Sequence, residues 1–156
     1  MKLQIESPEL DLEYLMSLPG FTLRYYPATP ENGDQLNSFY VGQLAYSKTD
    51  ERKKILRQGM GVMRYSNGRQ YEGEWEDDRR NGRGFERYSN NNSYFGSFKD
   101  GKAHGKGVYK WINGEVYDGE WECGLKHGHG VWTSSDGCDS YIGEWKHSKA
   151  EGYGIH

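Results

Sequence analysis

The chain has few of the features that mark secreted, membrane-spanning or nucleic-acid-binding proteins. Its two cysteines, Cys123 and Cys138, are too few for a disulfide scaffold. No secretory segment follows Met1 and no apolar run approaches the length of a membrane span, so we expect a cytoplasmic protein. The net charge of −3 gives no general attraction to nucleic acid, and we expect no nucleic-acid partner.

Hydrophobic side chains are also scarce, whereas aromatic rings and glycines are abundant. Hydrophobic residues make up 34% of the chain and charged residues 28%, but 15% are aromatic and 22 residues are glycine. A disordered chain would lack the rings. This composition favours a thin, extended structure in which rings supply most of the buried apolar area.

The rings and glycines recur at a fixed interval. A Tyr-x-Gly-x-aromatic frame begins at Tyr71, Tyr94, Tyr117 and Tyr141, with steps of 23, 23 and 24 residues. A Gly-x-Gly frame keeps the same step, and a shared period indicates a stack of similar units. The Gly-x-Gly frames begin at Gly59, Gly82, Gly105, Gly128 and Gly152.

Each unit is predicted to be one β-hairpin. A short strand follows Gly-x-Gly, and the Tyr-x-Gly-x-aromatic strand runs back after a turn at sites such as Asn67-Gly68 and Asn113-Gly114. Asn-Gly supplies the positive φ values of two-residue hairpin turns. Because a lone hairpin is barely stable in water, the units must stack. We therefore predict an all-β fold, an open single-layered solenoid of stacked hairpins.

The alternation of a strand gives this sheet two different faces. Tyr71, Gly73 and Trp75 share one face, and Glu72 and Glu74 point to the other. A strand glycine flanked by rings implies that a ring lies over it. The sequence therefore predicts one aromatic face and one polar face rich in carboxylates.

The two ends depart from the repeat. Residues 1–38 are predicted to form a short cap, with a helix starting at Ser7-Pro8 and a strand over 21–26. Residues 39–156 hold about five units, the last of them incomplete. The first unit carries a charged insertion near 47–55, either a binding loop or a solvated one. An unpaired strand edge invites pairing, so we expect a homodimer through a repeat end.

The repeats resemble the MORN repeat (membrane occupation and recognition nexus). The closest copy is the segment from Tyr117 to Gly130, and the resemblance covers about three quarters of the chain. Leu44 and residues 148–151 depart from the pattern, which makes the first and last units weaker copies. The resemblance implies a rod or groove that binds proteins, scaffolds cytoskeletal structures, tethers membranes, dimerises or precedes a catalytic domain.

The ring column is the predicted protein-binding groove, because it carries more rings than a thin sheet should bury by itself. We expect an amphipathic helix, an extended peptide or a second copy of the chain to lie in it. The predicted groove residues are Tyr71, Trp75, Tyr94, Phe98, Tyr117, Trp121, Tyr141 and Trp145.

Bases that flank the Gly-x-Gly frames are the predicted phosphate or lipid contacts, since backbone nests with nearby bases bind phosphates. In the other interpretation, the glycines serve tight bends and the bases pair with neighbouring acids such as Asp77 and Asp78. The bases in question are Arg79, Arg80, Arg83, Lys102, Lys106 and Lys126.

No residues are predicted to hold a metal or cofactor, or to catalyse a reaction. His104 and His127 share one repeat position, and Cys123 and His147 share another, but no Cys-x-x-Cys pair occurs. Carboxylates on an exposed face share similar surroundings, so they lack the separation of pKa values that acid–base catalysis needs. We therefore expect a non-catalytic scaffold module, at the cytoskeleton or the membrane periphery. The alternative is a phosphoinositide-binding, membrane-targeting or regulatory segment of a larger enzyme, such as a phosphoinositide kinase or a SET-type methyltransferase.

Overall fold

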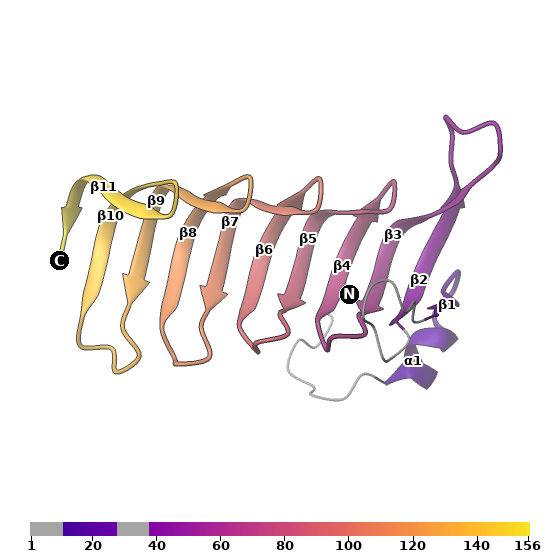
Figure 1. Ribbon diagram of the computed structural model, residues 1–156, viewed down its shortest axis with the longest axis horizontal. Helices are drawn as coiled ribbons and strands as arrows, with labels where there is room; N and C mark the ends of the chain where they lie inside the picture. Colours follow the sequence, from indigo (N-terminus) through magenta and orange to yellow (C-terminus); the bar gives the residue numbers. More distant parts are fainter. Residues whose placement is uncertain (1–10, 28–37) are drawn as a thin grey trace.

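The computed structural model describes residues 11–27 and 38–156, which form a short helix and one eleven-stranded sheet (Figure 1). Each strand pairs antiparallel with the next one in the chain, so the sheet extends in sequence order from β1 to β11. The predicted all-β stack of hairpins is confirmed. The strands are β1 (Thr22–Tyr26), β2 (Ser38–Tyr46), β3 (Ile55–Arg64), β4 (Gln70–Glu76), β5 (Arg79–Arg87), β6 (Ser93–Lys99), β7 (Lys102–Lys110), β8 (Val116–Glu122), β9 (Leu125–Thr133), β10 (Ser140–Lys146) and β11 (Lys149–Ile155).

The two ends of the hairpins carry different connections, and the predicted place of the tight turns is wrong. Asn67-Gly68 lies in a longer loop, in which the Tyr65 N–H bonds to the Arg69 carbonyl and Gly68 alone has a positive φ, of 85°. The two-residue turns lie at the other end, where both residues have positive φ. These turns are Asp77–Asp78, Asp100–Gly101, Cys123–Gly124 and His147–Ser148.

The tight turns also join neighbouring hairpins. The second residue of each turn donates its N–H to a carbonyl one unit earlier, as from Gly101 to Arg80 at 2.8 Å and from Gly124 to Ala103 at 2.8 Å. In Figure 1 these turns form the upper edge of the stack, and the longer loops form the lower edge. Each repeat therefore adds one backbone hydrogen bond to a ladder that joins neighbouring units along the edge of the stack.

The first glycine of each Gly-x-Gly frame lies at a β-bulge. Gly73 pairs with Gly84 and Trp75 pairs with Arg80, so β5 has extra residues opposite Glu74. Gly82 takes a φ of 71° in this bulge, and the Glu74 carboxylate accepts the Arg83 N–H at 2.8 Å. The acid of the repeat frame therefore supports the bulge, besides lying on the polar face.

A zigzag of edge-to-face rings forms the core along one side of the sheet, here called the aromatic face. The Tyr71 ring lies 5.0 Å from Trp75 and 5.1 Å from Phe98 of the next unit, and later units repeat the pattern. The predicted ring over the glycine is confirmed, because a Cβ placed on Gly84 would lie 2.5 Å from the Tyr71 hydroxyl. The ring covers glycines of two adjacent strands, so only glycine fits beneath it.

The buried rings have partners for their polar atoms. The Tyr71 hydroxyl donates to the Glu74 carbonyl at 2.9 Å, and the Trp75 indole N–H donates to the Gly61 carbonyl at 3.2 Å. Equivalent bonds recur at Tyr117 and Trp121. These bonds explain how a thin sheet can bury such rings, since an unpaired buried donor would cost about 1–3 kcal/mol.

The N-terminal segment packs against the opposite face at the start of the stack. Helix α1 (Leu12–Ser17) begins after Asp11, whose carboxylate accepts the Tyr14 N–H at 2.9 Å, and Leu15 packs on Val41 and Val62. The predicted helix start at Ser7 lies outside the described residues. The predicted strand over 21–26 corresponds to β1, and the insertion forms a loop over 47–54 between β2 and β3 (Figure 1).

The opposite face is less polar than predicted. Phe85 pairs with Phe95 across β5 and β6, and Val131 pairs with Ile142 across β9 and β10. Phe95 is 38% exposed and Ile142 54% exposed. Carboxylates of the repeat frame thus share this face with an apolar row.

Candidate functional site

The predicted groove residues lie together on the aromatic face, but they are already packed within the chain. Seven of the eight rings are between 0 and 9% exposed, and Tyr141 is half-buried. The expectation that a thin sheet leaves them exposed is wrong, because the tyrosine of one unit packs edge-to-face on the Trp or Phe of the next unit. Their direct contact with a partner stays a prediction.

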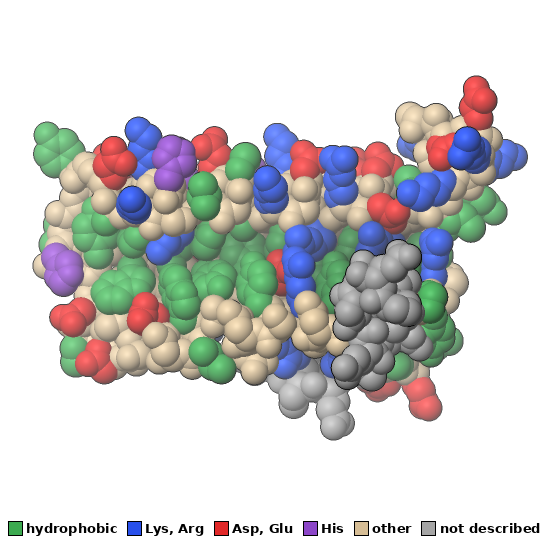
Figure 2. Space-filling model, in the orientation of Figure 1, with side chains coloured by type: hydrophobic (Ala, Val, Ile, Leu, Met, Phe, Trp, Pro, Cys, Tyr) green, Lys and Arg blue, Asp and Glu red, His purple; other side chains and the backbone are tan. Residues whose placement is uncertain are grey.

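A second set of rings covers this core and remains accessible. Tyr109 lies 4.6 Å from Trp111 and 5.8 Å from Tyr88, and all three are half-buried. Figure 2 shows this face as a strip of apolar side chains that runs along the stack between two more polar rims. The half-buried rings packed on the core include Tyr65, Tyr88, Tyr109, Trp111, Trp132 and Tyr141.

Cations from a single repeat position lie over the rings. Arg57 lies 4.3 Å from the Trp75 ring centroid, and the Lys126 ammonium lies 4.4 Å from that of Trp145. Such contacts stabilise by about 0.5–2 kcal/mol. Burial lowers the pKa of Lys126, against the opposing charge of Glu115. Arg57, Arg80 and Lys126 are spaced by one and then two repeats, 23 and 46 residues, and this shared repeat position is the signal that sequence reasoning missed.

A buried ion cluster occupies the centre of the aromatic face in the β5–β6 hairpin. Glu86 is only 1% exposed, and its carboxylate accepts bonds from Arg80, at 2.5 Å, and from Arg69. The Arg80 guanidinium also lies 5.5 Å from the Phe98 ring. Arg80, predicted to contact phosphate, is therefore engaged in the core.

Tyrosines of this face are held in their neutral form. Burial, together with the nearby carboxylates of Glu120 and Asp118, raises the pKa of Tyr117 to about 12. Burial likewise raises the pKa of Tyr71 and Tyr94 well above the ordinary value. A phenol that stays neutral can donate its hydrogen bond to the strand carbonyl throughout the physiological pH range.

The other predicted phosphate contacts do not join Arg80 and Lys126 on this face. Arg79 is paired with Asp100 at 3.0 Å, and Lys106 lies opposite Glu120 in the strand register. Arg83 lies over the Phe95 ring of the opposite face, at 5.4 Å. Figure 2 shows basic and acidic side chains interspersed along the upper rim. The six bases therefore do not form one continuous row.

The described residues show no constellation that would bind a metal. Within residues 11–27 and 38–156, His, Cys, Asp and Glu side chains do not gather in a group of three or more that could hold an ion. His127 lies 3.6 Å from Glu122, and Cys123 is an exposed turn residue. In the same part of the chain, no helix is both long and apolar enough to cross a membrane.

Comparison with known families identifies the repeats. The MORN repeat model matches five consecutive segments, 53–68, 71–93, 94–116, 117–139 and 141–156. A comparison with curated protein sequences finds no match. MORN repeats are known as protein- and membrane-interaction repeats. The matched segments cover most of the chain and coincide with its stacked hairpins, so the chain belongs to the MORN repeat family.

Proposed function

We propose that this chain is a non-catalytic interaction module that holds an extended peptide or helix of a partner protein on its aromatic face. The supporting observation is the half-buried set of rings around Tyr109, Trp111 and Trp132, over a core that needs no partner to be buried. Rigid, partly exposed aromatic side chains are the usual anchors of protein interfaces. Residues of the fully buried core would then shape the groove from beneath.

The C-terminal half of the face is the better docking site. Glu86 and its two arginines occupy the centre of the β5–β6 hairpin, whereas Tyr109 and Trp132 take the same position in the next two hairpins. The Trp132 indole N–H bonds to Glu115 at 3.0 Å, which fixes the ring while leaving it half-buried. A fixed ring loses little conformational entropy when a partner covers it.

The chemistry of the strip favours a partner with apolar side chains and few acids. Its walls are ring faces, which attract apolar groups and cations. Lys126 and Glu115 supply one charge of each sign beside the rings. An extended strand or an amphipathic helix can lay one apolar row along such a strip.

The test uses peptides selected from a displayed library on the whole chain, with affinities measured by fluorescence anisotropy. Trp132→Ala is expected to weaken binding about thirtyfold, the loss typical of a hot-spot residue. Ile142→Ala, on the opposite face and 54% exposed, is the matched control and should bind like the wild type. Circular dichroism checks that both variants fold.

Equal weakening by both substitutions, or wild-type binding by Trp132→Ala, would contradict the proposal. Light scattering of the peptide-free protein separates the two kinds of occupant. A concentration-dependent dimer that Trp132→Ala disrupts would assign the strip to a second copy of the chain.

A further inference from the structure

A row of basic side chains follows the lower edge of the stack, on the face opposite the rings. Arg64, Arg87 and Lys110 end alternate strands, β3, β5 and β7, at steps of 23 residues. In the strand register Arg64 lies opposite Gln70, and Gln70 lies opposite Arg87. Directly paired residues share a face, so the two arginines flank Gln70 with their Cα atoms about 10 Å apart.

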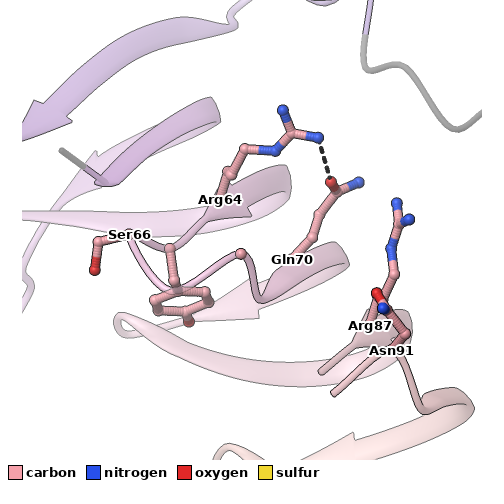
Figure 3. Close-up of a pocket in the computed structure, with 7 residues that line it drawn as sticks. Arg64, Ser66, Gln70, Arg87 and Asn91 are labelled. Atoms are coloured by element: carbon pink, nitrogen blue, oxygen red, sulfur yellow. Dashed lines mark hydrogen bonds between the residues drawn. The ribbon is translucent and has the colours of Figure 1, made fainter. Parts of the chain in front are cut away.

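A pocket of about 280 Å³ lies between these arginines and the loops that follow them. It is lined by Arg64, Gln70, Arg87 and Asn91, among others. Figure 3 shows Arg64, Gln70 and Arg87 extending in the same direction from three adjacent strands, with Asn91 beside Arg87. The two guanidinium groups can therefore reach one ligand.

The floor of this pocket is fixed. Gln70 is only 3% exposed; its carbonyl accepts the Arg64 guanidinium at 3.1 Å, and its amide donates to Glu72. This chain of bonds orients Arg64 and engages the carboxylate two residues further along β4. Glu72 is thus the acid that limits the positive charge beside the pocket.

The two arginines differ from most others of the sheet in having no acid partner within residues 11–27 and 38–156. Arg57, Arg69, Arg79 and Arg80 each have a carboxylate within 4 Å. No such ion pair occurs for Arg64 or Arg87 among the residues that the structure describes. Neighbouring guanidinium groups without counter-charges fit a dianion, and the planar donor fork of arginine matches phosphate oxygens.

We infer that the pocket between Arg64 and Arg87 binds a phosphate monoester group, carried by a free small molecule or by a lipid headgroup. Each guanidinium donates to phosphate oxygens, and the Asn91 amide adds a neutral donor. The site lies away from the aromatic strip, so it is independent of the proposed peptide binding.

The first arm of the test measures binding of soluble inositol trisphosphate to the whole chain by titration calorimetry at moderate salt. Arg64→Gln and Arg87→Gln are each expected to weaken binding at least about tenfold, because each removes a charge-assisted contact. Glu72→Gln should strengthen binding severalfold. Arg79→Gln removes the same charge elsewhere on the surface and should leave the affinity unchanged.

The second arm measures sedimentation with phosphatidylcholine vesicles that carry the same headgroup, with plain vesicles as control. Binding to both forms, lost in Arg87→Gln, assigns the site to a lipid headgroup; binding to the soluble form alone assigns it to a free phosphate. Arg87→Lys keeps the charge without the fork and should recover only part of the affinity. No saturable binding in either arm, or an equal loss in Arg79→Gln, would overturn the inference.

Discussion

The β5–β6 and β7–β8 hairpins have the same backbone plan but differ at the centre of the aromatic face. Arg80 and Glu86 of the first correspond to Ala103 and Tyr109 of the second, 23 residues later. Glu86 is buried between two guanidinium groups, whereas Tyr109 is half-buried and packs edge-on against Trp111. One hairpin fills its centre with ions, and the other presents a ring.

This difference shows what the repeat requires and what it leaves free. Both hairpins keep the tyrosine over paired glycines and the edge-to-face ring contacts, as at Tyr94 and Trp121, 5.2 Å apart. The central position needs only a side chain that packs on the core rings and whose buried polar atoms are paired. The ion cluster of Glu86 occupies the aromatic face of its hairpin, whereas the Tyr109 ring leaves that face available to a partner. Binding sites can therefore vary from hairpin to hairpin while the backbone of the stack stays the same.

Removal of the central acid should have the largest effect on stability. Glu86→Ala leaves the Arg69 and Arg80 side chains, 30% and 16% exposed, without their shared carboxylate. Uncompensated buried charge is strongly destabilising, and we expect a loss of roughly 3 kcal/mol in the free energy of unfolding, measured in urea.

The control for this substitution is Glu122→Ala, which removes a carboxylate that is 58% exposed and faces His127. Its expected effect is below about 0.5 kcal/mol, as for most surface positions. If Glu86→Ala were as stable as this control, the ion cluster would not stabilise the centre of the β5–β6 hairpin.

A smaller effect should be common to both hairpins. Gly84→Ala places a Cβ 2.5 Å from the hydroxyl of Tyr71, and Gly107→Ala meets Tyr94 in the same way. Those rings are held by hydrogen bonds of 2.9 Å to strand carbonyls, so overpacking should cost about 1–3 kcal/mol at each site. Urea unfolding should give similar losses for the two variants.

Gly137→Asn is the matched control for the glycine substitutions. Gly137 has a φ of 73° and open space around it, and asparagine tolerates this conformation. A loss close to zero is expected there. Markedly different losses at Gly84 and Gly107 would show that the two hairpins do not share one tyrosine–glycine framework.

The fold could be predicted because the period, the strand glycines and the tyrosines are all visible in the sequence as short-range patterns. Alternation along β4 correctly placed Tyr71 and Trp75 on one face. The tight turns were misplaced because Asn67-Gly68 is a strong local signal, while Asp77–Asp78 forms the two-residue turn without any glycine. At Asp77–Asp78, the hydrogen bond from the turn to the preceding hairpin outweighs the weaker local turn propensity of the two residues.

The candidate site was harder to predict because it depends on contacts between units. Alternation from Gly84 puts Glu86 on the aromatic face, but its partner Arg69 comes from a loop 17 residues earlier. The bulge after Gly73 shifts the register by two residues, which brings Arg80 opposite Trp75. No spacing rule within one hairpin reveals these pairings, although the common position of Arg64 and Arg87 is visible in the repeat.

Two substitutions convert the centre of the β5–β6 hairpin into that of the β7–β8 hairpin. Arg80→Ala with Glu86→Tyr reproduces the Ala103 and Tyr109 pair, and we expect unfolding within about 1 kcal/mol of the wild type, since well-packed apolar groups can replace a buried ion cluster. Arg69 keeps its place over the Tyr65 ring, at 5.1 Å, and can turn to solvent. A urea double-mutant cycle measures the coupling, because Glu86→Tyr alone leaves the Arg80 and Arg69 charges without their carboxylate, and Arg80→Ala alone removes one of the two cations that pair with Glu86. A double variant as unstable as Glu86→Ala would mean that the ions are specific to the β5–β6 hairpin, and that the central position is not interchangeable between units.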